Sequence, residues 1–221
     1  MLKIIIGNRA YSSWSMRGWL AVKQSGEEFE EFVVPLFDDE WEKRREGDEF
    51  APSLGKVPIL WDGDCVVWDS LAIIDFLADR HGRELFWPAD DSARGMARSM
   101  AAEMHSGFAN LRRELPMNVR KSYPPGDISD EVKAEIDRIM QLWAQARARF
   151  GGTGNFLFGD WCAVDIMYAP VVTRFITYGV PVPPFAALYM KAVLSHPHVD
   201  EWLDKAQDEP WVIEQYETEQ P

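Results

Sequence analysis

The sequence predicts an α/β domain followed by an all-helical domain. Strand and helix patterns alternate in the first part of the chain in the order βαβαββα. From residue 91 onward no strand pattern is convincing, and helical periodicities follow one another instead. The expected boundaries are a first domain over 1–82, a linker over 83–90 and a second domain over 91–221.

Two strands and the helix between them open the chain. Residues 2–6 form an apolar run, which is typical of a strand buried on both faces. Residues 29–36 are rich in β-branched and aromatic side chains and predict a second strand, parallel to the first through a βαβ crossover. The helix between them is predicted over 14–24, with Ser12 or Ser13 as its N-cap.

A short helix, a β-hairpin and a longer helix complete the first domain. The charged stretch 38–50 predicts a short exposed helix. Residues 57–61 and 65–68 flank Asp62-Gly63-Asp64, which is a strong hairpin signal. The helix that follows carries one apolar face and is expected to end at His81.

The second domain is predicted to be helical throughout. Its helical stretches are separated by breaks rich in proline and glycine, of which Tyr123-Pro124-Pro125-Gly126-Asp127 is the clearest. The expected helical ranges are 92–119, 128–150, 165–178, 185–194 and 199–207.

Composition and charge exclude several classes of protein. Of the 221 residues, 47% are hydrophobic and 27% are charged, which is ordinary globular usage and excludes disorder as the main state. No apolar run approaches the ~18 residues that a membrane helix needs, and no secretory signal is visible, so we expect a cytoplasmic protein. The net charge of -13 disfavours nucleic acid and anionic membranes as partners.

Cysteine and histidine usage predicts neither disulfides nor a metal. Two cysteines, Cys65 and Cys162, cannot form a disulfide framework, which favours a reducing compartment. The four histidines are scattered, and no cluster has metal-ligand spacing. Cys65 lies in a hairpin strand and is expected to be buried and inert.

Pro58 lies where a strand is expected to begin. A proline within a sheet is confined to edges, strand starts and bulges. One interpretation is a trans proline at the strand start, and the other is a cis Val57–Pro58 bond. A cis bond would turn the Val57 N–H and C=O outward, where an extended peptide could pair with them.

Asp69-Ser70 opens the helix after the hairpin. Either residue could simply cap that helix. Free N–H groups at a helix N-terminus also bind carboxylates, and an aspartate beside them could pair with an ammonium. Together they would suit the head group of an α-amino acid.

Hydroxyl groups gather at the start of the first helix, in Tyr11-Ser12-Ser13-Trp14-Ser15-Met16-Arg17. Capping alone would explain them, but an anion would also gain there from the helix dipole and the hydroxyl donors. Because no His or Asp lies nearby in sequence to activate a serine, we expect a hydroxyl to donate a hydrogen bond rather than to attack.

These segments together resemble the cytosolic glutathione S-transferase family over essentially the whole chain. Gly55-Lys56-Val57-Pro58-Ile59-Leu60 is similar to the family's cis-proline segment, and Trp68-Asp69-Ser70-Leu71-Ala72-Ile73 is similar to its γ-glutamyl-binding turn. Ser12-Ser13-Trp14-Ser15-Met16-Arg17 resembles the Ser-Ser-Cys-x-x-Arg signature of the zeta class, the maleylacetoacetate isomerases. Residues 158–165 resemble the family's capping box in the second domain. The resemblance implies a thioredoxin-like first domain.

The resemblance also implies glutathione as co-substrate, no metal, and residues that would bind the tripeptide. Val57 and Pro58 would hold its cysteinyl backbone, and Asp69 and Ser70 would hold its γ-glutamyl end. Its glycyl carboxylate would meet one of two lysines, Lys43 or Lys56.

A serine at the first helix would stabilise the glutathione thiolate, with Ser12 as first choice and Ser13 as second. A small electrophile would bind in a cleft beside the helical domain. The side chains expected to line that pocket are Tyr11, Trp14, Met104, Phe108 and Arg112.

The chain departs from the family pattern at two positions. Trp14 stands where zeta enzymes carry their signature cysteine, so thiol chemistry from the protein is not expected there. Cys162 replaces the Ser or Thr of the capping box, which leaves Asp165 to bond back without the usual hydroxyl partner.

Three functions compete at this level. The leading one is a transferase that adds glutathione to small hydrophobic electrophiles. The zeta-like signature suggests instead a glutathione-dependent cis–trans isomerase, whose dicarboxylate substrate would need cations such as Arg112 or Arg174. The third is a non-catalytic ligand-binding or scaffold dimer. A homodimer is expected in each case, from the resemblance and from the ten Trp and twelve Phe, which are many for one chain to bury.

Overall fold

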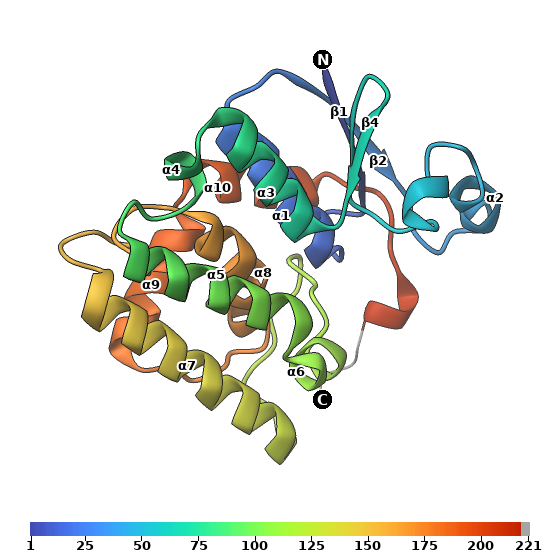
Figure 1. The fold of residues 1–221 in the computed structure, drawn as a ribbon. Helices are drawn as coiled ribbons and strands as arrows, with labels where there is room; N and C mark the ends of the chain where they lie inside the picture. Colours follow the sequence, from blue (N-terminus) through green and yellow to red (C-terminus); the bar gives the residue numbers. More distant parts are fainter. Residues whose placement is uncertain (218–221) are drawn as a thin grey trace.

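The computed structural model describes residues 1–217 and has two parts (Figure 1). A four-stranded sheet with three helices forms the first part, and helices alone form the second. This arrangement confirms the predicted fold class, a thioredoxin-like domain followed by an all-helical one. The described residues include no helix that is long and apolar enough to cross a membrane.

The sheet is mixed and has the strand order β2-β1-β3-β4. Strand β1 (Leu2–Gly7) pairs in parallel with β2 (Phe29–Val34), as the crossover predicts. On its other side β1 pairs antiparallel with β3 (Ile59–Asp62), which forms the predicted hairpin with β4 (Cys65–Trp68). The apolar residues of β1 are buried on both faces because helices cover both sides of the sheet.

Helices α1 (Ser13–Ser25) and α3 (Ser70–His81) pack together on the face of the sheet that meets the helical part. The short helix α2 (Trp41–Arg45) lies on the other side (Figure 1). The predicted exposed helix is thus reduced to five residues. The buried Trp41 and Phe50 anchor the stretch against the sheet.

The helical part differs from the prediction in two places. The stretch 92–119 is two helices, because Gly107 and Phe108 interrupt it and Phe108 adopts a left-handed conformation with φ 55°. The stretch 83–90, predicted as a linker, begins with one helical turn. The helices are α4 (Arg83–Phe86), α5 (Asp91–Ser106), α6 (Ala109–Glu114), α7 (Asp130–Phe150), α8 (Ala163–Thr177), α9 (Pro184–Leu194) and α10 (Pro197–Gln207).

Helix α8 forms the centre of the molecule. Every one of its residues except Ile176 is buried. It contacts α5 and α9 in its own part and α1 in the other. The packing of α8 on α1 therefore fixes how the start of α1 faces the helical part.

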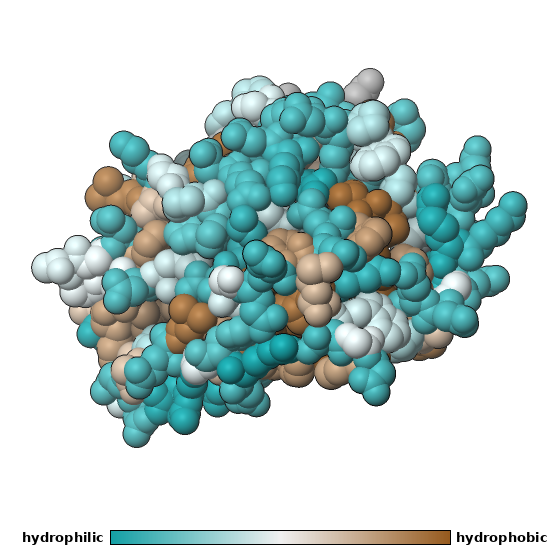
Figure 2. Space-filling view, turned by 90° about the horizontal axis from the view of Figure 1, so that it is seen from above, coloured by the Kyte–Doolittle hydropathy of each residue, from teal (hydrophilic) through white to brown (hydrophobic). Residues whose placement is uncertain are grey.

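The expectation that Cys65 is buried is wrong. Cys65 is exposed, because it stands at the start of the edge strand β4. Among the described residues the exposed large aromatic side chains are Trp68, Phe32 and Phe37, at 46%, 44% and 57% of their surface. Figure 2 shows a mostly hydrophilic face with apolar side chains in small separate groups, in keeping with the net charge of -13.

Candidate functional site

Ser12 forms the N-cap of α1, and its hydroxyl forms its hydrogen bonds within the first turn of that helix. Its Oγ accepts a hydrogen bond from the Ser15 N–H at 3.3 Å and donates one to the Ser15 Oγ at 2.8 Å. Ser15 Oγ also accepts from the Gly7 N–H at 2.9 Å, at the end of β1. The Ser12 hydroxyl therefore joins the helix to the sheet.

Ser13, the first residue of α1, has a different environment. Its Oγ accepts a hydrogen bond from Nη2 of Arg174 in α8, at 3.2 Å. Within residues 1–217 no acceptor lies within hydrogen-bonding distance of its hydroxyl hydrogen. Because a cation on the oxygen polarises the O–H bond, Ser13 can donate a strengthened hydrogen bond to an anion.

Three arginines converge on this helix start. The guanidinium groups of Arg17 and Arg112 lie 4.7 Å and 5.3 Å from the ring centroid of Trp14. Arg174 reaches the same place through Ser13. None of the three takes part in an ion pair in the described chain, although Asp69 acts electrostatically on Arg17 and Glu135 acts on Arg112.

Burial makes this cluster of charge costly. It lowers the pKa of Arg17 well below its usual value, and the nearby Arg174 and Arg112 lower it further. Burial and Arg112 likewise lower the pKa of Arg174 to about 10. Arg17 Nη2 is buried without a hydrogen-bond partner among the described residues. An anion bound here would relieve both the repulsion and the missing hydrogen bond.

The segment before β3 presents free backbone groups. The Val57–Pro58 peptide bond is cis. Pro58 packs directly on α1 at Gly18, where a Cβ would lie only 2.6 Å from Pro58 Cγ, so glycine is required for this approach. The Val57 N–H and C=O form no hydrogen bond with any residue described, and an extended peptide could pair with them.

Asp69 and Ser70 occupy the start of α3. Asp69 caps the helix, since its Oδ1 accepts from the N–H groups of Leu71 at 2.8 Å and Ala72 at 3.3 Å. It adopts a positive φ of 78°. Ser70 Oγ is buried and has no partner among the described residues, which leaves a donor without an acceptor beside the cap.

His105, on α5, is a member of this site that the sequence does not reveal. Its Nε2 lies 2.6 Å from Asp69 Oδ2, and its ring lies 5.4 Å from that of Trp14. It thereby joins the start of α3 to the start of α1. Its sequence position carries no signal, because only the fold brings α5 beside both helix starts.

The other predicted residues divide into exposed and buried groups. Lys43 and Lys56 are exposed and take part in no ion pair of the described chain. Met104 and Phe108 belong to the hydrophobic core, so their predicted place in the second-substrate pocket is not visible in this structure. Tyr11 is also buried, and its hydroxyl is occupied by Arg120 and Glu217.

At the start of α8 an aspartate of the helix itself accepts hydrogen bonds from the free backbone N–H groups. Asp165 accepts hydrogen bonds from the N–H groups of Cys162 at 2.9 Å and Leu157 at 3.3 Å. Burial raises the pKa of the Cys162 thiol well above its usual value. A thiol in this state is unreactive.

Comparison with known proteins supports the same class of fold. Residues 11–80 match the family model described as Glutathione S-transferase, N-terminal domain. Glutathione S-transferase GstB of Escherichia coli (strain K12) is 22% identical over 160 residues, 72% of each chain. Glutathione S-transferase 1 of Dianthus caryophyllus is 26% identical over 186 residues, 80% of each chain.

Solved structures agree over nearly the whole chain. A glutathione transferase homolog from Burkholderia GL BGR1, with bound glutathione, has a TM-score of 0.68 and 21% identity, and the match covers 94% of this chain and 98% of that one. A maleyl pyruvate isomerase, a bacterial glutathione S-transferase in the zeta class, has a TM-score of 0.70 and 21% identity, covering 94% and 99%.

The molecule is thus a two-domain protein with a thioredoxin-like and an all-helical part. It has the fold of glutathione S-transferases, and residues 11–80 match the model of their N-terminal domain.

Proposed function

We propose that this chain is a glutathione transferase that adds the glutathione thiolate to a small electrophile. The buried, unpartnered Ser70 Oγ carries the proposal, because it lies beside the half-exposed Asp69 carboxylate at a helix N-terminus. In a ligand with a carboxylate and an ammonium on one carbon, the carboxylate would accept from Ser70 Oγ and the ammonium would join His105 at the Asp69 carboxylate. The free backbone of Val57 would pair with the peptide that follows.

The geometry favours Ser13 as the residue that stabilises the thiolate, in place of the first choice, Ser12. The Ser12 hydroxyl already donates to Ser15, whereas the Ser13 hydroxyl is polarised by Arg174 and free to donate. A thiol with a pKa of ~8.5 is mostly protonated at neutral pH. A charge-assisted hydrogen bond and the α1 dipole would both favour its thiolate form.

Exchanging the two serines for alanine tests this role. Ser13→Ala should lower turnover at pH 6.5 by about tenfold, a loss of about 1.4 kcal/mol of thiolate stabilisation, and move the pH–rate profile upward. Ser12→Ala should keep most of the turnover. The opposite result would return the role to Ser12, and no loss in either variant would exclude this loop from thiolate stabilisation.

Glutathione binding itself is tested at Asp69. Asp69→Ala should weaken retention on immobilised glutathione, since a charge-assisted contact to the ligand ammonium contributes about 1.5–3 kcal/mol. Cys65→Ala is the control, because Cys65 is exposed in the same first domain. Equal retention of the two variants would remove Asp69 from the site.

A glutathione-dependent isomerase acting on a dicarboxylate is the second candidate. The three arginines without carboxylate partners favour it, because they would hold carboxylates beside the thiolate. The similar zeta-class fold of the maleyl pyruvate isomerase agrees with it. Comparing turnover of an aryl halide with that of maleylacetoacetate distinguishes the two candidates, since the transferase requires the first and the isomerase the second.

The proposal includes a homodimer in the cytoplasm, without a metal, as the sequence predicts. The support for the dimer is the family resemblance, together with the exposed aromatic side chains Phe32, Phe37 and Trp68. Light scattering over a dilution series gives the test. A mass of 25.3 kDa at every concentration would exclude the dimer.

A further inference from the structure

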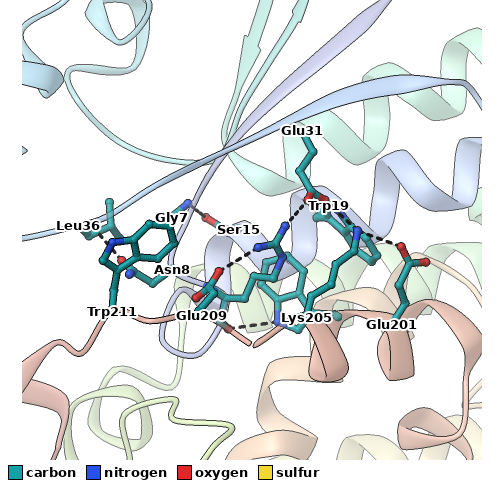
Figure 3. A network of polar contacts seen from close by, with 12 residues as sticks. Gly7, Asn8, Ser15, Trp19, Glu31, Leu36, Glu201, Lys205, Glu209 and Trp211 are labelled. Atoms are coloured by element: carbon teal, nitrogen blue, oxygen red, sulfur yellow. Dashed lines mark hydrogen bonds and ion pairs between the residues drawn. The ribbon is translucent and has the colours of Figure 1, made fainter. Parts of the chain in front are cut away.

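Two of the pairs that join the first domain to the rest of the chain differ in how far solvent reaches them. Arg9, which follows β1, pairs with Glu209 at 3.0 Å and with Glu31 of β2, and in Figure 3 dashed lines lead from Glu209 across this network to Glu31. The side chains of Arg9 and Glu209 are 8% and 4% exposed, so their contact is closed to a ligand. Those of His105 and Asp69 are 31% and 41% exposed, which leaves their contact open to one.

The Asp69 carboxylate has little room for a further donor. An ionised carboxylate accepts hydrogen bonds at about four lone-pair positions. The N–H groups of Leu71 and Ala72 both use Oδ1, at 2.8 Å and 3.3 Å. His105 Nε2 lies 2.6 Å from Oδ2. A ligand ammonium that reaches this carboxylate therefore has to share Oδ2 with His105.

The contact with Asp69 also defines which nitrogen of His105 can take up a proton. Because an ionised carboxylate only accepts, Nε2 carries a hydrogen and donates it to Asp69. A second proton is therefore taken up at Nδ1, and the ring then carries a positive charge. Histidine is the side chain whose charge ordinarily changes between about pH 5 and pH 8. The charge beside Oδ2 is thus sensitive to pH.

Charged groups from four helices surround this imidazole. The Asp69 carboxylate at the start of α3 and the C-terminal end of α5, whose last turn includes His105, both favour its charged form. Arg112 of α6, which donates to the His105 carbonyl at 3.3 Å, opposes it, as does Arg17 of α1, which lies on the Trp14 ring beside His105. A ligand ammonium at Asp69 would be a further cation in this group, so the repulsion is strongest when His105 is charged.

We propose that His105 sets the affinity of the site for ligands with an α-ammonium, because its neutral form admits the ammonium to Asp69 Oδ2 and its charged form excludes it. The proposal rests on the function proposed above. A ligand that binds while His105 is charged releases the Nδ1 proton to water, so its affinity falls as the pH falls. His105 acts through Asp69 and is therefore a positioning residue.

S-Methylglutathione, which has no thiol to ionise, provides the first test, by calorimetry. The wild type should bind it about fivefold more weakly at pH 5.5 than at pH 7.0, since the ligand ammonium is protonated at both and only the charge of His105 changes. In His105→Gln, whose amide still donates to Asp69 but does not titrate, the two affinities should agree within about twofold. His81→Gln is the matched control and should keep the wild-type difference, because His81 lies 2.6 Å from the Glu27 carboxylate at the opposite end of α3.

The outcomes separate this proposal from the proposed function. Equal affinities of the wild type at the two pH values, or an unchanged difference in His105→Gln, would overturn the proposal. A wild type that does not bind S-methylglutathione at pH 7.0 contradicts the proposed function instead. An analogue with a glutaryl group in place of the γ-glutamyl group keeps the carboxylate and lacks the ammonium, so its affinity should be the same at both pH values. The same fall for this analogue would show that His105 does not act on the ammonium, and would also overturn the proposal.

Urea unfolding of the free protein tests the contact between His105 and Asp69 without a ligand. At pH 5.5 the effect of His105→Gln on the unfolding equilibrium constant should be about threefold larger in the wild type than in the Asp69→Asn background, because only the wild type sets a carboxylate against the charged ring. This coupling should be smaller at pH 7.0. Additive effects of the two substitutions at pH 5.5 would overturn the proposal, whether or not glutathione binds.

Discussion

Helices α1 and α8 both begin with free backbone N–H groups, but they differ in the charged side chains around these groups. Both helices begin in buried surroundings and pack against each other. At α8 the chain supplies its own anion, since Asp165 reaches back to the free N–H groups. At α1 the first turn contains no acidic residue, and arginines without carboxylate partners gather around it instead.

This is the difference we expect between a structural helix start and one that binds a ligand. An arrangement whose donors and acceptors are all matched gains nothing from a further group. One with a surplus of buried donors and positive charge gains from an anion that the protein itself does not provide. By this criterion the anion belongs at α1 and not at α8, although both starts carry small polar or sulfur-containing caps.

The largest expected effect comes from removing the carboxylate that accepts hydrogen bonds at the start of α8. Asp165→Ala should lower the free energy of unfolding by about 2–6 kcal/mol, because two buried N–H groups would lose their acceptor and each costs about 1–3 kcal/mol. Urea unfolding measures the change. Asp160→Ala, at an exposed position before the same helix, is the control and should stay within about 0.5 kcal/mol of the wild type.

The contribution of Asp165 to the free energy of unfolding should depend on pH. Burial raises the pKa of Asp165 from 3.8 to about 6, so the group favours the folded state below its unfolded pKa, and this stability is lost as the pH rises through about 6. Asp165→Asn does not titrate. The unfolding free energy of the wild type minus that of Asp165→Asn should therefore decrease between about pH 4 and about pH 7. A difference that is constant over this range would show that Asp165 does not titrate within it.

At α1, removal of the cap should have a moderate effect. Ser12→Ala should cost about 1 kcal/mol of stability, because the Ser15 N–H loses its acceptor and the connection to β1 is broken. Thermal and urea unfolding would measure it. A stability loss as large as that of Asp165→Ala would mean that the two helix starts do not differ as described.

The smallest expected effect concerns the positive charge of the arginine cluster at the start of α1. Arg112→Gln should weaken inhibition by a small dicarboxylate such as maleate about fivefold, since a partly buried cation contributes about 1 kcal/mol to such a contact. Arg113→Gln is a matched control on the same helix, because Arg113 is exposed and bonded to Asn110. Inhibition constants that respond equally to the two substitutions would leave the cluster without a ligand-binding role.

Local patterns predict much of this fold. The apolar run at residues 2–6, the hairpin turn at residues 62–64 and the cap at Ser12 each specify their element through neighbouring residues alone. Gly107 ends α5, but no local pattern indicates that Phe108 adopts the left-handed conformation from which α6 begins. The exposure of Cys65 depends on strand order, which no local pattern encodes.

In the candidate site, too, some residues can be predicted from local sequence and others only from the fold. Pro58, Asp69 and Ser70 are visible in the sequence because each lies in a short motif at the end of an element. His105 and Arg174 are visible only in the fold, since they reach the site from helices that are remote in the sequence. The choice between Ser12 and Ser13 also depends on tertiary contacts, as both are equally able to cap a helix.

The contact between Arg9 and Glu209 spans 200 positions of the chain and has a consequence for synthesis. Arg9 therefore emerges from the ribosome 200 residues before its carboxylate partner. Contacts of such long range form late, because the intervening chain must first be in place. The bond between Arg9 and Glu209 therefore forms only after α10 has been made, and we expect the loop beside Arg9 to reach its final form at that stage.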